Sequence, residues 1–215
     1  MNYAEVNLVL AWVAVQGLQP DQALAALEME YSEDADVRDV ADWPNFSERA
    51  DFRERVFVGL LPGDWLLLFG DIDEDEKECL AALAKFGPTF LGQQFSTGCF
   101  SEARWYADGQ QAWRLDYDSE CRSPYDRLKI DGQLPDNLVQ IVGQAYTAAA
   151  QGIVPKLSLD IVWEVPGKLS KAVCGFDPQE GPPDGFRWSM VQPIGGVPAP
   201  EPEQRGWLSR LFGRR

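Results

Sequence analysis

A chain of 215 residues with 45% hydrophobic and 12% aromatic content can form one large domain with a substantial core, which excludes disorder for the chain as a whole. Its 34 acidic residues outnumber 19 Lys and Arg, and the formal charge of -15 excludes general binding to nucleic-acid phosphates. Such a surface favours a basic protein partner, although the same charge also serves solubility alone.

The chain contains no histidine, and this absence excludes several kinds of catalytic site. Ser-His-Asp and Cys-His catalysis need an imidazole, as do H-E-x-x-H zinc sites and facial-triad iron sites. No glycine-rich phosphate-binding motif occurs either, so we expect no cofactor. Carboxylate-pair chemistry remains open because glycosidases use only Asp and Glu. The balance favours a protein that is not an enzyme.

Metal binding and disulfide bonds are not expected from the sequence. The acidic run Asp71–Glu76 resembles the start of a calcium loop, but Glu76 and Ala82 occupy the positions that need Gly and Glu. The cysteines are Cys79, Cys99, Cys121 and Cys174. They form no C-x-x-C pair, which predicts reduced and mostly buried thiols.

The first residues favour a cytoplasmic protein. Glu5 precedes the apolar run Val6–Val15, and no Lys or Arg comes before Arg38, so the pattern of a secretory signal peptide is absent. The run is also far shorter than the roughly 20 residues that cross a bilayer.

The predicted elements begin with Val6–Val15, where β-branched residues favour a strand over a helix ending at Gly17. A helix follows from Pro20, and the acid-rich segment Glu28–Asp42 is expected to be an exposed connection. Further strands are expected at Arg55–Leu60, Trp65–Phe69, Thr89–Phe95, Cys99–Tyr106, Gln110–Tyr117 and Phe186–Gln192. Further helices are expected at Glu74–Lys85, Leu134–Gln151 and Lys168–Val173, with Asp160–Val165 as a short strand or the start of a helix.

These strands are joined by tight turns such as Asp108-Gly109 and alternate only loosely with helices. We therefore predict an α+β fold, with a mainly antiparallel sheet and packed helices in a single domain of residues 1–192. The aromatic side chains Trp105, Trp113 and Tyr117 are expected to lie in its core.

The composition changes after the predicted domain. Residues 193–204 are rich in Pro and Gly and predict a linker. Residues 205–215 place Trp207, Leu208, Leu211 and Phe212 on one helical face among four arginines. This basic amphipathic tail predicts weak contact with an anionic membrane or docking in a groove, or else a tail that folds back on the acidic body or stays mobile.

Two acidic segments are the predicted partner-binding sites. The first comprises Asp71, Asp73, Glu74, Asp75, Glu76 and Glu78. These acids open a predicted helix, whose positive N-terminal end tolerates negative charge. The second comprises Glu33, Asp34 and Asp36. The alternative for both segments is a solvated surface without a partner.

Three stretches of the chain resemble bacterial toxin-immunity proteins. They are VQGLQPDQAL from Val15 to Leu24, the hairpin WYADGQQAWRLDYD, and Val165-Pro166 leading to Cys174-Gly175-Phe176. The resemblance implies a cytoplasmic protein that binds and neutralises a cognate toxin, such as an effector of a type VI secretion system. It implies no particular contact residue. A carboxylate-dependent enzyme and an adaptor or chaperone for a secreted protein are the alternatives.

Overall fold

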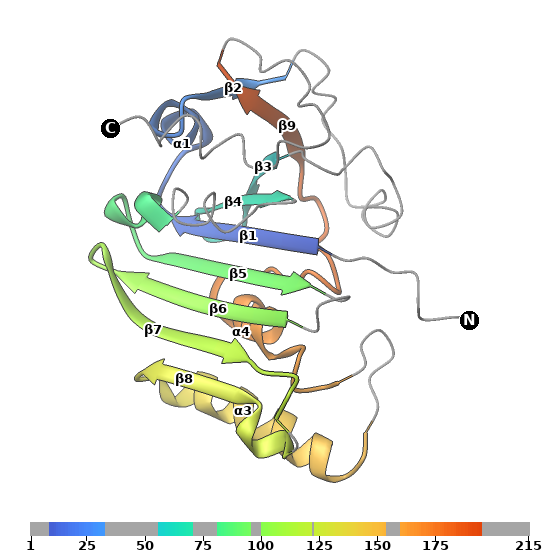
Figure 1. The fold of residues 1–215 in the computed structure, drawn as a ribbon. Helices are drawn as coiled ribbons and strands as arrows, with labels where there is room; N and C mark the ends of the chain where they lie inside the picture. The colour runs from blue at the N-terminus through green and yellow to red at the C-terminus, as the bar shows by residue number, and fades with distance from the viewer. Residues whose placement is uncertain are drawn as a thin grey trace.

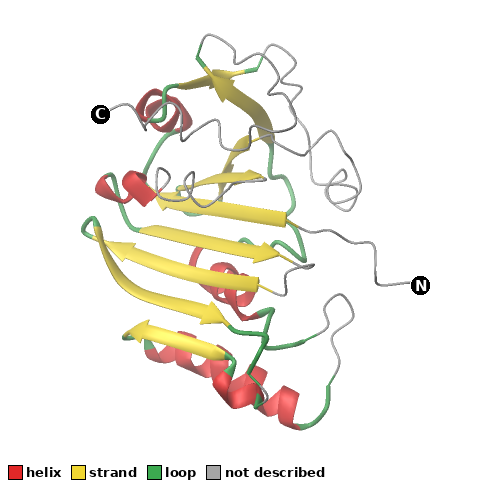
Figure 2. Cartoon of the chain, in the orientation of Figure 1, coloured by secondary structure: helices red, strands yellow, loops and turns green. Residues whose placement is uncertain are grey.

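The computed structural model describes residues 9–32, 56–70, 81–95, 100–121, 123–153 and 160–194. These residues form a nine-stranded antiparallel sheet in the order β2-β9-β3-β4-β1-β5-β6-β7-β8 (Figure 1). The strands are β1 Val9–Gln16, β2 Met29–Tyr31, β3 Val56–Leu61, β4 Trp65–Gly70, β5 Thr89–Phe95, β6 Phe100–Ala107, β7 Gln110–Tyr117, β8 Leu128–Gly132 and β9 Trp188–Pro193. The helices are α1 Pro20–Ala26, α3 Asp136–Ala150 and α4 Val165–Cys174, with 3-10 turns η4 Ala82–Lys85 and η5 Pro124–Asp126. The predicted α+β class is confirmed (Figure 2).

The first strand lies at the centre of the sheet, between β4 and β5. No residue from Leu10 to Val15 is more than 1% exposed, because layers of side chains cover both faces of β1. This explains why the run is apolar throughout and does not alternate with polar residues, as a strand with one wet face would. The strand interpretation is confirmed.

One face of the sheet, here called the α3–α4 face, carries the larger core. Both helices lie behind the sheet in Figure 1, and the core includes Leu10, Trp12, Phe90, Leu115, Leu138, Val142 and Leu169. The Trp12 indole donates a 2.9 Å hydrogen bond to Ser170 Oγ of α4. Gly92, opposite Trp12 on β5, leaves space for that ring. The two segments are thus joined across 158 positions of sequence.

The opposite face, here called the α1 face, is apolar only over part of the sheet. Side chains of β1, β3, β4 and β5 pack there with Leu24 of α1 and Leu83 of η4. From β6 onward the same face carries charged residues. Arg104 of β6, for example, lies opposite Leu91 of β5 in the strand register and therefore points to the same face as Leu91. Apolar side chains therefore cover both faces of the central strands, whereas β6, β7 and β8 are polar on the α1 face.

Most predicted elements are found where the sequence places them. The turn Asp108-Gly109 has φ of 52° and 73°, the positive angles that a tight hairpin turn requires. Trp113 and Tyr117 are buried and Trp105 is partly buried against the core, as predicted. The helix predicted at Lys168–Val173 is present and is longer than predicted, because α4 runs from Val165 to Cys174. Residues 161–164 form a turn that leads into this helix.

Some predictions differ from the structure. The prediction of an exposed connection from Glu28 is wrong for Met29–Tyr31, which forms β2 beside β9. Met29 is buried there. The strand that pairs with β2 lies too far along the chain for a local sequence pattern to indicate it. The edge strand β8 is absent from the prediction. Of the helix expected at Glu74–Lys85, only the end is described, and Ala82–Lys85 is a 3-10 turn.

None of the helices in the described residues is long and apolar enough to cross a membrane. The linker beyond Ile194 and the amphipathic tail lie outside the described ranges.

Candidate functional site

The acids predicted to bind a partner all lie outside the described residues. They are Asp71, Asp73, Glu74, Asp75, Glu76 and Glu78 in one segment and Glu33, Asp34 and Asp36 in the other. Their role therefore stays a prediction. The charged half of the α1 face supplies a second candidate, which the sequence reasoning missed.

Six charged side chains from three adjacent strands form what we call the charged strip. Its members are Glu102 and Arg104 on β6, Arg114 and Asp116 on β7, and Lys129 and Asp131 on β8. In the strand register Glu102 lies opposite Asp116, which lies opposite Lys129. Because alternate residues of a strand share a face and paired residues lie side by side, all six belong to the α1 face.

Exposure increases along the strip from the middle of the sheet to its edge. Glu102 is 0% and Arg104 4% exposed, and they form an ion pair of 3.2 Å. Arg114 is 37% exposed and reaches Glu102 at 3.3 Å. At the outer strand Lys129 is 67% exposed. A buried ion pair at the inner end of the strip is thus continuous with charges that a partner can touch.

The register of the strip places like charges directly opposite each other. Glu102 faces Asp116, and Arg104 faces Arg114, an arrangement that is unfavourable unless it is compensated. Arg114 supplies the compensation because it pairs diagonally with Glu102 and, at 2.8 Å, with Asp116 on its own strand. The side chains of Glu102, Arg104, Arg114 and Asp116 therefore hold each other in place through these ion pairs.

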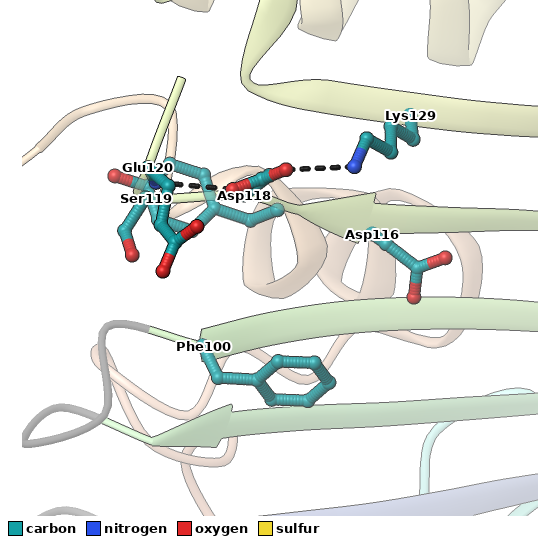
Figure 3. Close-up of a pocket in the computed structure, with 7 residues that line it drawn as sticks. Phe100, Asp116, Asp118, Ser119, Glu120 and Lys129 are labelled. Atoms are coloured by element: carbon teal, nitrogen blue, oxygen red, sulfur yellow. Dashed lines mark hydrogen bonds and ion pairs between the residues drawn. The ribbon is translucent and has the colours of Figure 1, made fainter. Parts of the chain in front are cut away.

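An open hollow of about 380 Å³ adjoins the strip where β7 ends. Its lining residues are Phe100, Asp116, Tyr117, Asp118, Ser119, Glu120 and Lys129. Figure 3 shows the Lys129 side chain reaching toward Asp118, with Asp116 and the Phe100 ring below them in the view. The hollow contains three carboxylates and one ammonium group, next to the Phe100 ring.

Hydrogen bonds fix the charge state of Asp118. Lys129 Nζ donates to Asp118 Oδ2 at 2.7 Å, and the Glu120 main-chain N–H donates to Oδ1 at 3.0 Å. The Lys129 bond, followed by the Glu120 bond, lowers the pKa of Asp118 below its usual value. The same pair raises the pKa of Lys129. Both groups are ionised at neutral pH, which suits Asp118 to bind a cation rather than to act as an acid.

A second polar cluster of the described chain, around Asp160, has a structural role. Asp160 accepts a 2.8 Å hydrogen bond from the Tyr117 hydroxyl and another from the main chain of Val162, and it is ion-paired with Arg127. This cluster ties the turn before α4 to the end of β7. No group of three or more Asp, Glu or Cys side chains within the described ranges could hold a metal ion.

The two cysteines in described positions are free thiols, Cys121 half-buried and Cys174 buried; Cys79 and Cys99 lie outside those ranges. Burial raises the pKa of Cys174. Desolvation, followed by the charge of Asp118, raises the pKa of Cys121. A raised pKa disfavours the reactive thiolate, so neither thiol has the environment of a catalytic nucleophile.

A periodic signal for the charged strip is present in the sequence. Charged residues alternate with neutral ones in Glu102-Ala103-Arg104, Arg114-Leu115-Asp116 and Lys129-Ile130-Asp131, the period of a strand with one polar face. The densest acidic runs are a stronger signal in the sequence, whereas a pattern that is spread over three strands becomes a cluster only in the sheet.

Comparisons of the chain with models of protein families, with curated proteins and with solved structures found no match. The site is therefore interpreted from its geometry and chemistry alone.

Proposed function

We propose that the chain is a binding protein that neutralises a cognate bacterial toxin or effector by docking on the charged strip and its hollow. The observation that carries this proposal is the graded ionic surface, fully buried at Glu102 and open at Lys129. A rigid ionic base with exposed outer members is preorganised for a charged partner, because its side chains are ordered before binding.

The hollow indicates which chemical group of the partner would dock there. Asp116, Asp118 and Glu120 outnumber Lys129, and the side chain of Phe100 lines the hollow beside them. Carboxylates pair with a guanidinium or ammonium group, and an aromatic ring gains further energy from a cation over its face. An arginine or lysine side chain of a basic partner is the expected occupant.

The formal charge of -15 supports the same kind of partner. A strongly acidic protein attracts a basic one over several ångströms and speeds their encounter, an effect that salt weakens. Toxins that act on nucleic acids or other anionic substrates often present basic clefts, and carboxylates that fill such a cleft block it. Neutralisation needs no turnover, which agrees with a chain without histidine.

The carboxylate-enzyme alternative needs a group that stays protonated at neutral pH to act as general acid. The lowered pKa of Asp118 is the opposite of that requirement. The open shape of the hollow also gives a substrate little shielding from water. These features favour binding over catalysis at this site.

The test is co-expression with the product of the neighbouring reading frame, followed by binding kinetics of the purified pair. Protection of growth and a stable complex are expected, with association that slows as salt increases. Glu120→Lys should slow association about threefold to tenfold. The matched control Asp184→Lys reverses another exposed acid, in the turn before β9, and should have less effect.

A parallel variant addresses the acids outside the described residues. Reversing Asp73, Glu74 and Glu76 to Lys measures their contribution in the same assay. A larger effect there than at Glu120 would move the interface to that segment. Absence of both binding and growth protection would refute the proposed function.

A further inference from the structure

The outer strand β8 has main-chain groups directed away from the sheet. The Asp118 N–H donates to the Arg127 carbonyl at 2.7 Å, which makes these two residues a hydrogen-bonded pair of the β7–β8 ladder. Such pairs alternate along antiparallel strands, so Lys129 and Asp131 bond toward β7. The N–H and C=O groups of Leu128 and Ile130 and the N–H of Gly132 therefore point outward. The Leu128 N–H is hydrogen-bonded to the Tyr146 hydroxyl of α3, and the φ of 83° at Gly132 turns its C=O away from the regular strand direction. Within the described chain, β8 is the last strand of the sheet.

The sequence of β8, Leu-Lys-Ile-Asp-Gly, complements itself when it is reversed. An antiparallel copy centred on Ile130 places Ile130 opposite Ile130, and Lys129 opposite Asp131 twice. We propose that β8 pairs in this register with β8 of a second copy of the chain, which gives a symmetric dimer with one sheet continuous across both copies.

The outward main-chain groups fit the same register. Ile130 pairs with itself at the two-fold axis, and Leu128 pairs with Gly132 of the second copy on either side. The Ile130 N–H and C=O groups of the two copies can bond to each other, and the Gly132 N–H can bond to the Leu128 C=O of the second copy, which gives about four main-chain hydrogen bonds. The Lys129–Asp131 contacts fall at the intervening positions, where opposed side chains lie closest.

Shifted registers are disfavoured by charge. Sliding one copy by two residues brings Lys129 against Lys129 of the second copy, or Asp131 against Asp131, depending on direction. Like charges directly opposite each other destabilise a strand pair. Charges that only protect an edge from pairing need no such complementarity, whereas a two-fold interface requires each residue to match its reciprocal partner.

An apolar flank of α3 adjoins the same edge. Val139, Gly143 and Tyr146 share one side of the helix, being spaced by four and three residues. The Tyr146 ring contacts that of Tyr125, in η5 just before β8, at 5.5 Å between centroids. Figure 1 shows α3 running behind β8.

Exposure along this flank is high for apolar side chains. Val139 is 51%, Ile130 43% and Tyr125 57% exposed, and a methyl group on Gly143 would meet nothing within 4 Å. In a symmetric dimer these groups would be brought toward their copies next to the joined strands. Burial of apolar area then adds to the ionic and main-chain contacts.

The test is sedimentation of the full chain from about 1 to about 200 µM at near-physiological salt, where mass action reveals a dimer. The wild type should dimerise with increasing concentration. Asp131→Lys alone and Lys129→Asp alone should each weaken the dimer about tenfold to a hundredfold, because two attractive pairs become repulsive. An equimolar mixture of the two variants should re-associate, since their charges are complementary to each other.

Ile130→Pro provides a second, independent variant. It removes the outward N–H at the two-fold axis, while the ladder to β7 uses the flanking residues, so the fold should survive and the dimer should not. Circular dichroism checks the fold, and Asp184→Lys is the control that should leave dimerisation unchanged. A monomeric wild type, a dimer that tolerates Ile130→Pro, or a mixture that fails to re-associate would overturn the proposal. No partner protein is needed, so the outcome is separate from that of the binding experiment.

Discussion

The buried Glu102–Arg104 ion pair at the inner end of the charged strip gives the sharpest test of how this surface is held. Glu102→Gln preserves the shape of the side chain and removes its charge, so Arg104, only 4% exposed, loses the charge of the carboxylate that it contacts at 3.2 Å. Breaking a buried ion pair costs about 3–5 kcal/mol, because the remaining charge stays desolvated. Arg114 loses the same partner but is 37% exposed. Water therefore stabilises its charge, and its loss of this contact adds little to the fall in the free energy of unfolding.

Asp116→Asn is the matched control, because Asp116 is 30% exposed and pairs with the exposed Arg114. It should cost less than about 1 kcal/mol. Urea unfolding followed by tryptophan fluorescence measures both losses of stability. In thermal unfolding, the midpoint temperature of the Glu102→Gln variant should fall by about 10 °C. Similar small losses for the two variants would refute the reasoning, since burial would then add nothing to the value of the pair.

Two further predictions concern the core and the pH dependence of stability. Gly92→Ala would place a methyl carbon 2.2 Å from the fully buried Trp12 ring, and we expect urea titration to show a loss of about 1–3 kcal/mol. Gly143→Ala, where the added methyl group meets nothing, should instead stabilise α3 by about 0.5–1 kcal/mol; a loss there, or none at Gly92, would contradict the packing. Burial raises the pKa of Asp177, so its favourable contribution is complete below the unfolded-state pKa and is lost as pH rises through the folded value. Asp177→Asn cannot ionise and should exceed the wild type in stability at pH 7, with the difference vanishing in acid; an unchanged pH profile of unfolding would exclude this explanation.

The residues of the charged strip show how far sequence could lead toward the site. Alternation in Glu102-Ala103-Arg104 is readable as a strand with one polar face. The contact of Arg114 with Glu102 is not, because it depends on the register between β6 and β7. The prediction of a partner-binding site instead rested on the two acidic runs, which lie outside the described residues.

By itself, the sequence determined the local elements and the class of fold. The apolar run of β1, the Asp108-Gly109 turn and the amphipathic pattern of α3 depend on neighbouring residues, whose preferences act over a few positions. Only the tertiary structure decided which strands pair. It placed β2 beside β9, closed Trp12 onto Ser170, and left β8 at the edge with its outward main-chain groups. Such contacts join segments far apart in the chain, so their energy depends on the whole packed sheet and no local pattern records it.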